Sequence, residues 1–285
     1  MKLSSKQKLV FILAFSLLGL RAWSQSLQES FELAAHYVQI SQFELAAETY
    51  ERILFFDQNN TYRSRCFDQL AGCYIALGEW EKALTQLNFA YYQQTTQKGR
   101  NQIQFRLIVT YLLSGKPQSA KEEILILEDD LSEEETDRFH YYAGITYFSL
   151  EDFANSKAHF EAYLGEESTP LRDELDNIFL RNEKVSRINP KRARRMSQFL
   201  PGLGQAYAGN AKDAINSLLL TGGLLTLTVY VGINVSIFDA ILAVWPWFYR
   251  YYQGGYKRSE LMAFNKKERK RAEIYQELLQ LLARR

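Results

Sequence analysis

A repeat of about 37 residues runs through residues 28–164 and constrains the fold more than any other feature of the chain. Four tyrosines mark it: Tyr37, Tyr74, Tyr111 and Tyr147, which follow one another at intervals of 37, 37 and 36 residues. A period of this length is typical of solenoids, in which each unit buries its apolar face against the next. The repeat therefore predicts a stacked array of similar units.

Each tyrosine stands in the same frame of apolar and small residues. The pairs three and four residues before it are Leu33-Ala34, Leu70-Ala71, Leu107-Ile108 and Ala143-Gly144; six residues after it come Phe43, Trp80, Pro117 and Phe153; nine after it come Ala46, Ala83, Ala120 and Ser156; and thirteen after it come Tyr50, Leu87, Ile124 and Phe160. Apolar residues at helical spacing, then a polar or glycine-containing turn, then a small residue predict two closely packed helices in each unit.

The second unit carries a family resemblance. The segment CFDQLAGCYIALGEWEKALTQLNFA, residues 66–90, resembles a tetratricopeptide repeat closely, and the other units resemble it more loosely. We therefore expect an all-α solenoid over 26–164, with units at about 28–60, 64–97, 101–131 and 137–164. The resemblance implies a concave face that binds a peptide or a partner protein. Candidate residues for that face, at positions expected to be exposed on the first helices, are Gln39, Asn101, Gln104 and His140, for which simple solvation is the alternative.

The N-terminus is typical of an export signal. Lysines precede the apolar run LVFILAFSLLGL, and AWS ahead of Gln25 resembles a cleavage site. Residues 1–24 are therefore predicted to be a signal peptide cleaved after Ser24, while Arg21 leaves retention as an anchor open. This places the remainder of the chain outside the cytoplasm.

Downstream of the repeats the composition changes. Residues 165–190 predict a capping helix and linker, in which Pro170 suits a first helical turn. The basic run KRARR then precedes two apolar runs, 214–233 and 235–252, which predict a transmembrane hairpin within 191–256. The second run ends in an aromatic cluster typical of a membrane interface, with Asp239 near its start. A buried soluble hairpin is the alternative.

Between the basic run and the first apolar run lies LPGLGQAYAG. This string resembles the PGxGQxYxG element that opens two-helix membrane hairpins in bacterial envelope proteins, related in layout to the TM2 family, although the His-Phe-Tyr part of the TM2 signature is missing. The resemblance implies a membrane setting and no enzymatic activity. The matching residues are Pro201, Gly202, Gly204, Gln205, Tyr207 and Gly209. No Lys-Ser/Thr follows the glycines, which disfavours a phosphate loop.

The export signal and the basic flanks of the hairpin predict opposite orientations in the membrane. An exported solenoid leaves both ends of a hairpin outside, yet basic flanks favour the cytoplasmic side. Either the flanks bind anionic headgroups from the outer side, or the second run lies in the interface and the tail is cytoplasmic. Candidate membrane-surface residues are Arg192, Arg194, Arg195, Lys257 and Arg258, and residues 257–285 predict a basic amphipathic helix.

Catalytic and cofactor chemistry is not indicated. The three histidines are assigned to separate repeats without metal-ligand spacing. Cys66 and Cys73 lie seven residues apart on one expected helix, which separates their Cα atoms by about 10 Å. This distance is too long for a disulfide, so both are expected to be small buried side chains. A nucleic-acid platform is disfavoured because residues 28–164 lack a basic groove.

The sequence thus predicts a non-enzymatic adaptor without catalytic, metal or cofactor residues. It would be anchored in the bacterial cell envelope, with its repeats in the periplasm, and would bind partner proteins and membrane lipids. In the alternative hypothesis the hairpin is the active part, which forms homo-oligomers or assists membrane-protein insertion, and the repeats recruit.

Overall fold

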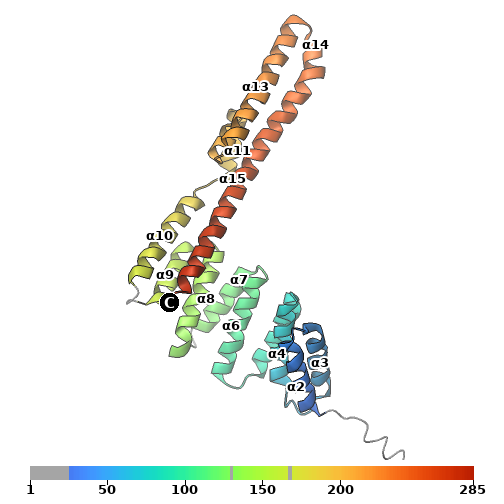
Figure 1. Cartoon of the computed structure of the whole chain (residues 1–285), viewed down its shortest axis with the longest axis vertical. Helices are drawn as coiled ribbons and strands as arrows, with labels where there is room; N and C mark the ends of the chain where they lie inside the picture. The colour runs from blue at the N-terminus through green and yellow to red at the C-terminus, as the bar shows by residue number, and fades with distance from the viewer. Residues whose placement is uncertain (1–25, 129–130, 166–168) are drawn as a thin grey trace, which may run out of the picture. The chain divides into compact units, whose positions relative to one another are not determined.

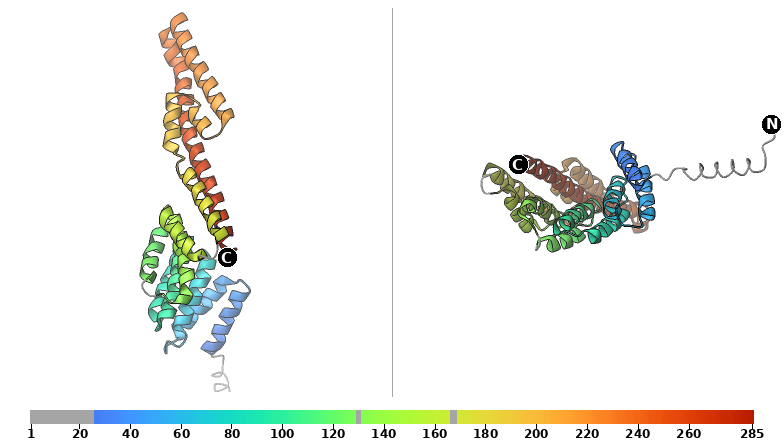
Figure 2. Two further views of the ribbon diagram at one scale, coloured as in Figure 1. Left: turned by 90° about the vertical axis from the view of Figure 1, so that its left-hand side faces the viewer. Right: turned by 90° about the horizontal axis from the view of Figure 1, so that it is seen from below.

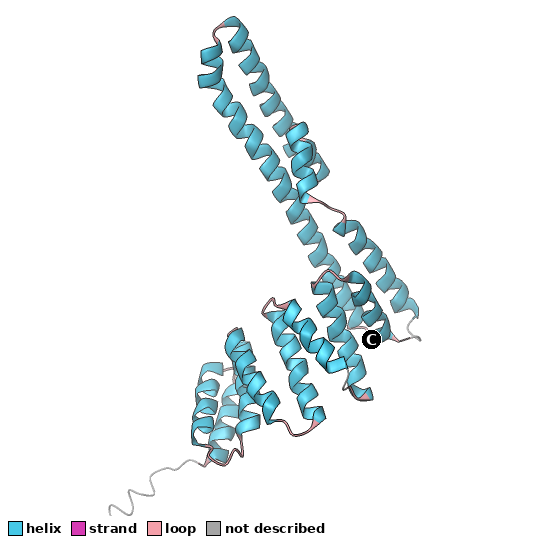
Figure 3. Ribbon diagram, turned by 180° about the vertical axis from the view of Figure 1, so that it is seen from behind, coloured by secondary structure: helices cyan, strands magenta, loops and turns pink. Residues whose placement is uncertain are grey.

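A computed structural model describes residues 26–128, 131–165 and 169–285. Within these ranges the chain is helical and contains no strand (Figure 3), which confirms the predicted all-α class. It divides into two compact units, Met1–Tyr163 and Leu164–Arg285, and each unit is treated separately below. The predicted signal peptide, residues 1–24, lies outside the described residues.

The described part of the first unit consists of four consecutive helical hairpins (Figure 1). This agrees with the hairpins that the repeat predicts. The helix pairs are α2 (Leu27–Gln39) with α3 (Phe43–Phe56), α4 (Arg63–Ala76) with α5 (Trp80–Gln93), α6 (Gln97–Leu113) with α7 (Pro117–Glu128), and α8 (Glu133–Ser149) with α9 (Phe153–Leu164).

The same turn closes all four hairpins. Four residues after each marker tyrosine the backbone turns left-handed, at Ser41, Gly78, Gly115 and Glu151, with φ of 59°, 73°, 71° and 61°. The amide of the next residue donates to the tyrosine carbonyl at 2.8–2.9 Å in every case. This is the Schellman C-cap, which satisfies carbonyls that the helix end leaves free. The tyrosine spacing in the sequence therefore reports the position of the helix end.

The small residues of the frame lie where the two helices of a hairpin meet. Ala46, Ala83 and Ala120 are fully buried, as is Ser156 in the fourth unit. Ser156 satisfies its hydroxyl by donating to the carbonyl of Gly144 at 2.9 Å. The residues thirteen after the tyrosines are also fully buried: Tyr50, Leu87, Ile124 and Phe160. The frame therefore encodes the core of each hairpin.

The two cysteines lie inside this core. Cys66 and Cys73 are both buried in α4, which confirms their expected burial. Burial raises the pKa of the Cys66 thiol to about 12 and that of Cys73 to about 11, because a thiolate loses its hydration there. Neither thiol is therefore suited to nucleophilic or metal chemistry near neutral pH.

The second unit contains a long helical hairpin and a cluster of shorter helices. Its elements are α10 (Thr169–Ser186), α11 (Pro190–Phe199), α12 (Leu203–Tyr207), α13 (Ala211–Asn234), α14 (Ile237–Asp239), the π-helical turn η1 (Ala240–Val244) and α15 (Trp245–Leu282). Helices α13 and α15 lie side by side in both Figure 1 and Figure 2. The expected capping helix is α10, which belongs to this unit and packs on the C-terminal half of α15 through Arg181–Glu277 and Arg284–Glu174 ion pairs.

The sequence predicts two separate helices for the second apolar run and for the basic C-terminal segment, and this prediction is wrong. One helix, α15, continues from Trp245 to Leu282 without a break near residue 257. Pro246 is accommodated in its first turn, directly after η1. A π-helical turn inserts an extra residue and so shifts the backbone partners that a proline inside a helix would disrupt.

Among the described residues, α13 is the single helix long and apolar enough to cross a membrane by length and composition. Its 24 residues measure about 36 Å. Only 6% of its most apolar 18-residue stretch is buried inside the protein. A helix spanning the second run alone, as expected for 235–252, is therefore not found.

At the left-handed turn position, substitutions in two hairpins should change the free energy of unfolding in opposite directions. Gly115→Ala should lower the free energy of unfolding by about 1 kcal/mol, because a Cβ is strained at this φ although the space around it is open. Ser41→Gly, which relieves the same strain in the first hairpin, should raise it by up to about 1 kcal/mol. Urea unfolding followed by circular dichroism measures both free energies. If the two variants changed stability in the same direction, the shared turn would be contradicted.

Candidate functional site

The glycine-rich element forms a sharp double turn in the second unit. Its central residues make the five-residue helix α12, and left-handed glycines lie on either side: Gly202 with φ 96° and Gly209 with φ 89°. Pro201 is half-buried at the end of α11. The Asn210 side chain then caps α13 by accepting from the Asp213 amide at 3.1 Å. The element thus reverses the chain and starts the long hairpin.

Two of the glycines are required by close backbone approach. A Cβ on Gly204 would lie 2.1 Å from the carbonyl oxygen of Ala193, and a Cβ on Gly202 would lie 2.3 Å from that of Ala214. Both distances are far below van der Waals contact, and the obstacles are backbone atoms that cannot turn aside. The glycines therefore let α12 press directly against α11 and α13.

Gln205 is the polar centre of this junction and is almost fully buried. Its side-chain oxygen accepts from the Ser197 hydroxyl at 2.8 Å, and its amide nitrogen donates to the Gly255 carbonyl at 2.9 Å. Ser197 in turn accepts from the Gly204 amide at 2.9 Å. One glutamine thus connects α11, α12 and α15. The sequence gives no signal for Ser197 and Gly255, because the two residues lie far apart along the chain and belong to no motif.

Tyr207 and Gly209 complete the junction. The Tyr207 hydroxyl accepts from the Asn189 amide at 3.1 Å, and the Arg192 guanidinium lies 5.9 Å from its ring centroid. The Lys266 ammonium lies 3.2 Å from where a Cβ on Gly209 would be. All six motif residues are therefore in one place. In this arrangement they hold helices together, which is a structural role.

Above the junction, α13 and α15 leave a cleft of about 480 Å³ between them. Its walls are mixed in character, with charged and polar residues as well as Leu220 and Tyr251. The polar lining residues are Gln205, Asp213, Asn216, Ser217, Thr221, Arg250 and Arg258. Asp213 and Arg258 form an ion pair at 3.4 Å across the helices.

The other predicted membrane-surface residues have mixed environments. Arg194 pairs with Glu260 at 3.2 Å and lies 5.1 Å from the Tyr256 ring centroid. Arg195 and Lys257 are exposed. The basic flank is thus partly used inside the unit, whereas Arg195 and Lys257 present their charges to the surface.

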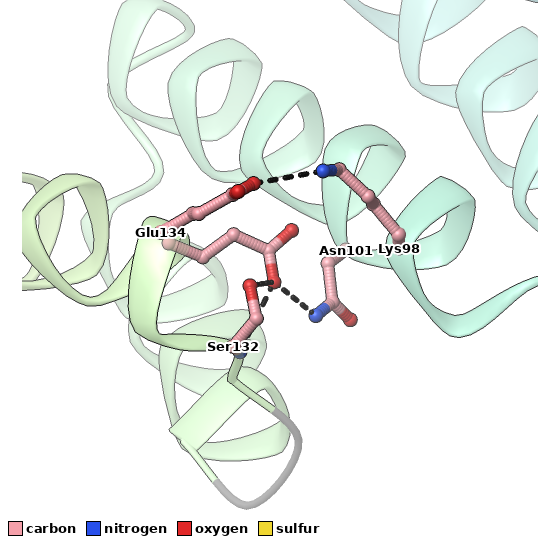
Figure 4. A network of polar contacts seen from close by, with 5 residues as sticks. Lys98, Asn101, Ser132 and Glu134 are labelled. Carbon is pink, nitrogen blue, oxygen red and sulfur yellow. Dashed lines mark hydrogen bonds and ion pairs between the residues drawn. The ribbon is translucent and has the colours of Figure 1, made fainter.

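The predicted partner-binding residues of the first unit do not form one exposed face. Gln39 is exposed, but Asn101 and Gln104 are buried, so their expected exposure is wrong. Asn101 donates to Glu135 at 2.9 Å, beside the Lys98–Glu134 pair in Figure 4. The Asn101 amide thus connects one hairpin to the next, which a helical wheel cannot distinguish from exposure.

Gln104 makes a comparable contact within its own hairpin. Its amide nitrogen lies 3.2 Å from the Glu123 carbonyl oxygen and 3.3 Å from the carboxylate of the same residue. Burial raises the pKa of the Glu123 carboxyl, because desolvation opposes its charge. Gln104 therefore satisfies half-buried acceptors inside its own hairpin.

His140 and His159 lie in the same hairpin, contrary to the assignment of all histidines to separate repeats. Their Nδ1 atoms are 3.0 Å apart, and His159 stacks on Tyr147 with ring centroids 5.3 Å apart. Burial and the neighbouring His140 lower the pKa of His159. Across the described part of the chain, no three His, Cys, Asp or Glu side chains are grouped so that they could hold a metal ion.

Comparison of the chain with protein-family models and with curated proteins gives no match.

The packing at the junction predicts that two glycines of the second unit differ strongly in the stability lost when each is replaced by alanine. Gly204→Ala should destabilise the second unit by about 2 kcal/mol, because its Cβ meets the Ala193 carbonyl. Gly223→Ala is the matched control, since a Cβ there meets nothing within 4 Å. Thermal unfolding of the full chain in neutral micelles measures both, while the helices of the first unit should stay folded. Equal losses in the two variants would contradict the packing role of Gly204.

The histidine pair predicts a pH-dependent stability of the fourth hairpin. The pKa of His159 is lower in the folded state than the ordinary value near 6.5, so the unfolded state binds more protons at acid pH. The contribution is complete above about pH 6.5 and is lost as the pH falls through the lower folded-state pKa of His159. Urea midpoints at pH 7 and pH 5 should show this drop. His159→Phe should reduce it, and His36→Phe should not.

Proposed function

We propose that the chain is a non-enzymatic, membrane-attached adaptor of the bacterial cell envelope. In this proposal the α13–α15 hairpin enters the membrane, and the helical hairpins of the first unit, which resemble tetratricopeptide repeats, hold a partner protein in the periplasm. The export signal predicted for residues 1–24 supports the location. The PGxGQxYxG resemblance supports the membrane setting.

The observation that carries the proposal is the outward apolar surface of the long hairpin. Ile233 is 77% exposed, Leu219 68% and Leu242 74%. From Ala214 to Phe238 the sequence contains no charge. Aromatic side chains follow at the start of α15, where the Trp247 ring stacks on the Tyr251 ring. Water is a poor solvent for so much adjoining apolar surface, whereas lipid is a good one.

The partner surface on the first unit needs different residues from those the sequence suggested. Phe55 at the end of α3 and Tyr92 at the end of α5 occupy equivalent repeat positions, and they are 81% and 79% exposed. Phe56 packs edge-on against Phe55, with ring centroids 5.0 Å apart. Exposed aromatic residues of this kind are typical binding anchors. We place the candidate partner contact at these helix ends.

One observation favours the alternative function, in which the hairpin associates with itself. Gly222 and Gly223 face open space, since a Cβ on either would meet nothing within 4 Å. Small residues on a membrane helix allow a second helix to approach closely. Under this alternative, Gly222→Leu should abolish oligomers in neutral micelles, whereas in the adaptor proposal the oligomeric state is unchanged.

Membrane attachment through the apolar surface has a direct test. Leu227→Arg places a charge near the middle of the uncharged run 214–238, where insertion then costs about 3 kcal/mol. The variant should therefore shift the full chain from the lipid fraction to the soluble fraction in vesicle flotation. Leu180→Arg is the matched control, because Leu180 is similarly exposed (55% against 45%) but lies on α10. Flotation of both variants alike would overturn the proposal.

A further inference from the structure

The cleft between α13 and α15 lies where the charged part of the hairpin meets its apolar part. On α13 the last charged residue before the apolar run is Asp213, and on α15 the first charge after Asp239 is Arg250. Arg258 and Asp213 lie at one end of the cleft, and Leu220 and Tyr251 belong to its apolar lining. The cleft therefore has both charged and apolar groups in its lining, as a bound lipid requires.

The cationic groups of the cleft exceed its acidic ones. Asp213 already accepts from the Asn210 amide at 2.6 Å and pairs with Arg258. The Arg250 guanidinium, by contrast, lies 6.0 Å from the centroid of the Trp247 ring. It forms no ion pair in the part of the chain that the structure describes. A guanidinium has a planar fork of donors that matches two oxygens of one anion.

Neutral donors and open space complete the site. Asn216, Ser217 and Thr221 line the α13 wall with an amide and two hydroxyls. On the α15 wall, a Cβ on Gly254 would meet nothing within 4 Å, so no side chain fills the gap. The cleft therefore offers donors around a volume that the protein itself leaves open.

We propose that this cleft binds a phosphate-bearing anionic group, with Arg250 as its principal ligand and the amide and hydroxyls of α13 as further donors. The proposal deepens the membrane attachment proposed above and rests on it for its source: in a membrane, the phosphate belongs to a lipid headgroup, and the acyl chain lies along Leu220 and its exposed neighbours. Free phosphate has the same headgroup chemistry without the chain.

The binding test uses the purified full chain in neutral maltoside micelles. Short-chain phosphatidylglycerol, phosphatidylcholine of the same chain length and inorganic phosphate are titrated separately, with thermal stabilisation and native mass spectrometry as the measurements. The lipid with the anionic headgroup should bind more tightly than the zwitterionic one. Tighter binding of the lipid than of inorganic phosphate assigns the site to a lipid, and equal binding assigns it to free phosphate. Equal binding of the two lipids would overturn the anion site.

Two variants change the site independently. Arg250→Gln should weaken binding of phosphatidylglycerol about tenfold, as expected for loss of one charge-assisted contact. Gly254→Leu fills the cleft but keeps every charge, and should also block the lipid. Arg195→Gln, which removes an exposed charge on α11 outside the cleft, should change binding less than twofold. If Arg250→Gln and Arg195→Gln lose affinity equally, the attraction is diffuse and the cleft proposal fails.

Failure of this proposal can be told apart from failure of membrane attachment. Flotation with neutral phosphatidylcholine vesicles depends on the apolar surface of the hairpin and should be unaffected by Arg250→Gln. A wild-type chain that does not float contradicts the attachment proposal. A chain that floats, but binds anionic and zwitterionic short-chain lipids alike, contradicts the cleft alone.

Discussion

The second unit depends on a contact between two stretches of backbone. The Ala193 carbonyl lies so close to Gly204 that no side chain fits between α11 and α12. This approach brings Gln205 against both Ser197 and the Gly255 carbonyl, so its two polar ends are satisfied inside the protein. A buried amide left without partners would cost about 1–3 kcal/mol. The glycines and the glutamine are thus one device, since each is useful only when the others are present.

The first unit solves a different problem, which is to end a helix and start its neighbour in the same way four times. Its solution is a left-handed residue at one fixed distance after a tyrosine, together with a small residue that lets the returning helix approach. Gly78 and Gly115 adopt this conformation without strain, whereas Ser41 and Glu151 adopt it at some cost. The variation is tolerated because the core positions around the turn remain fully buried in every hairpin.

Local pattern made the hairpins and their turns predictable from sequence, because helix ends and close helix contacts depend on nearby residues. The roles of Asn101 and Gln104 were not predictable, since a polar side chain on a helix has the same periodicity whether water or another hairpin faces it. The same limit hid the meeting of His140 with His159, nineteen residues later in the chain. For the junction, the sequence indicated the glycines and Gln205, but their partners Ser197 and Gly255 are defined only by the fold.

The continuity of α15 explains why the hairpin contains a cleft at all. Because η1 accommodates Pro246, the first part of α15 runs antiparallel to α13, and the two helices are linked near both ends of α13. Near the tip, a Cβ on Gly232 would lie 3.6 Å from the Ala240 Cβ of η1, and at the base the Asp213–Arg258 ion pair links α13 with α15. Between these ends, Gly254 supplies no side chain to fill the gap. The open volume therefore follows from the positions of the glycines, and the arginine beside it determines which chemistry it can accept.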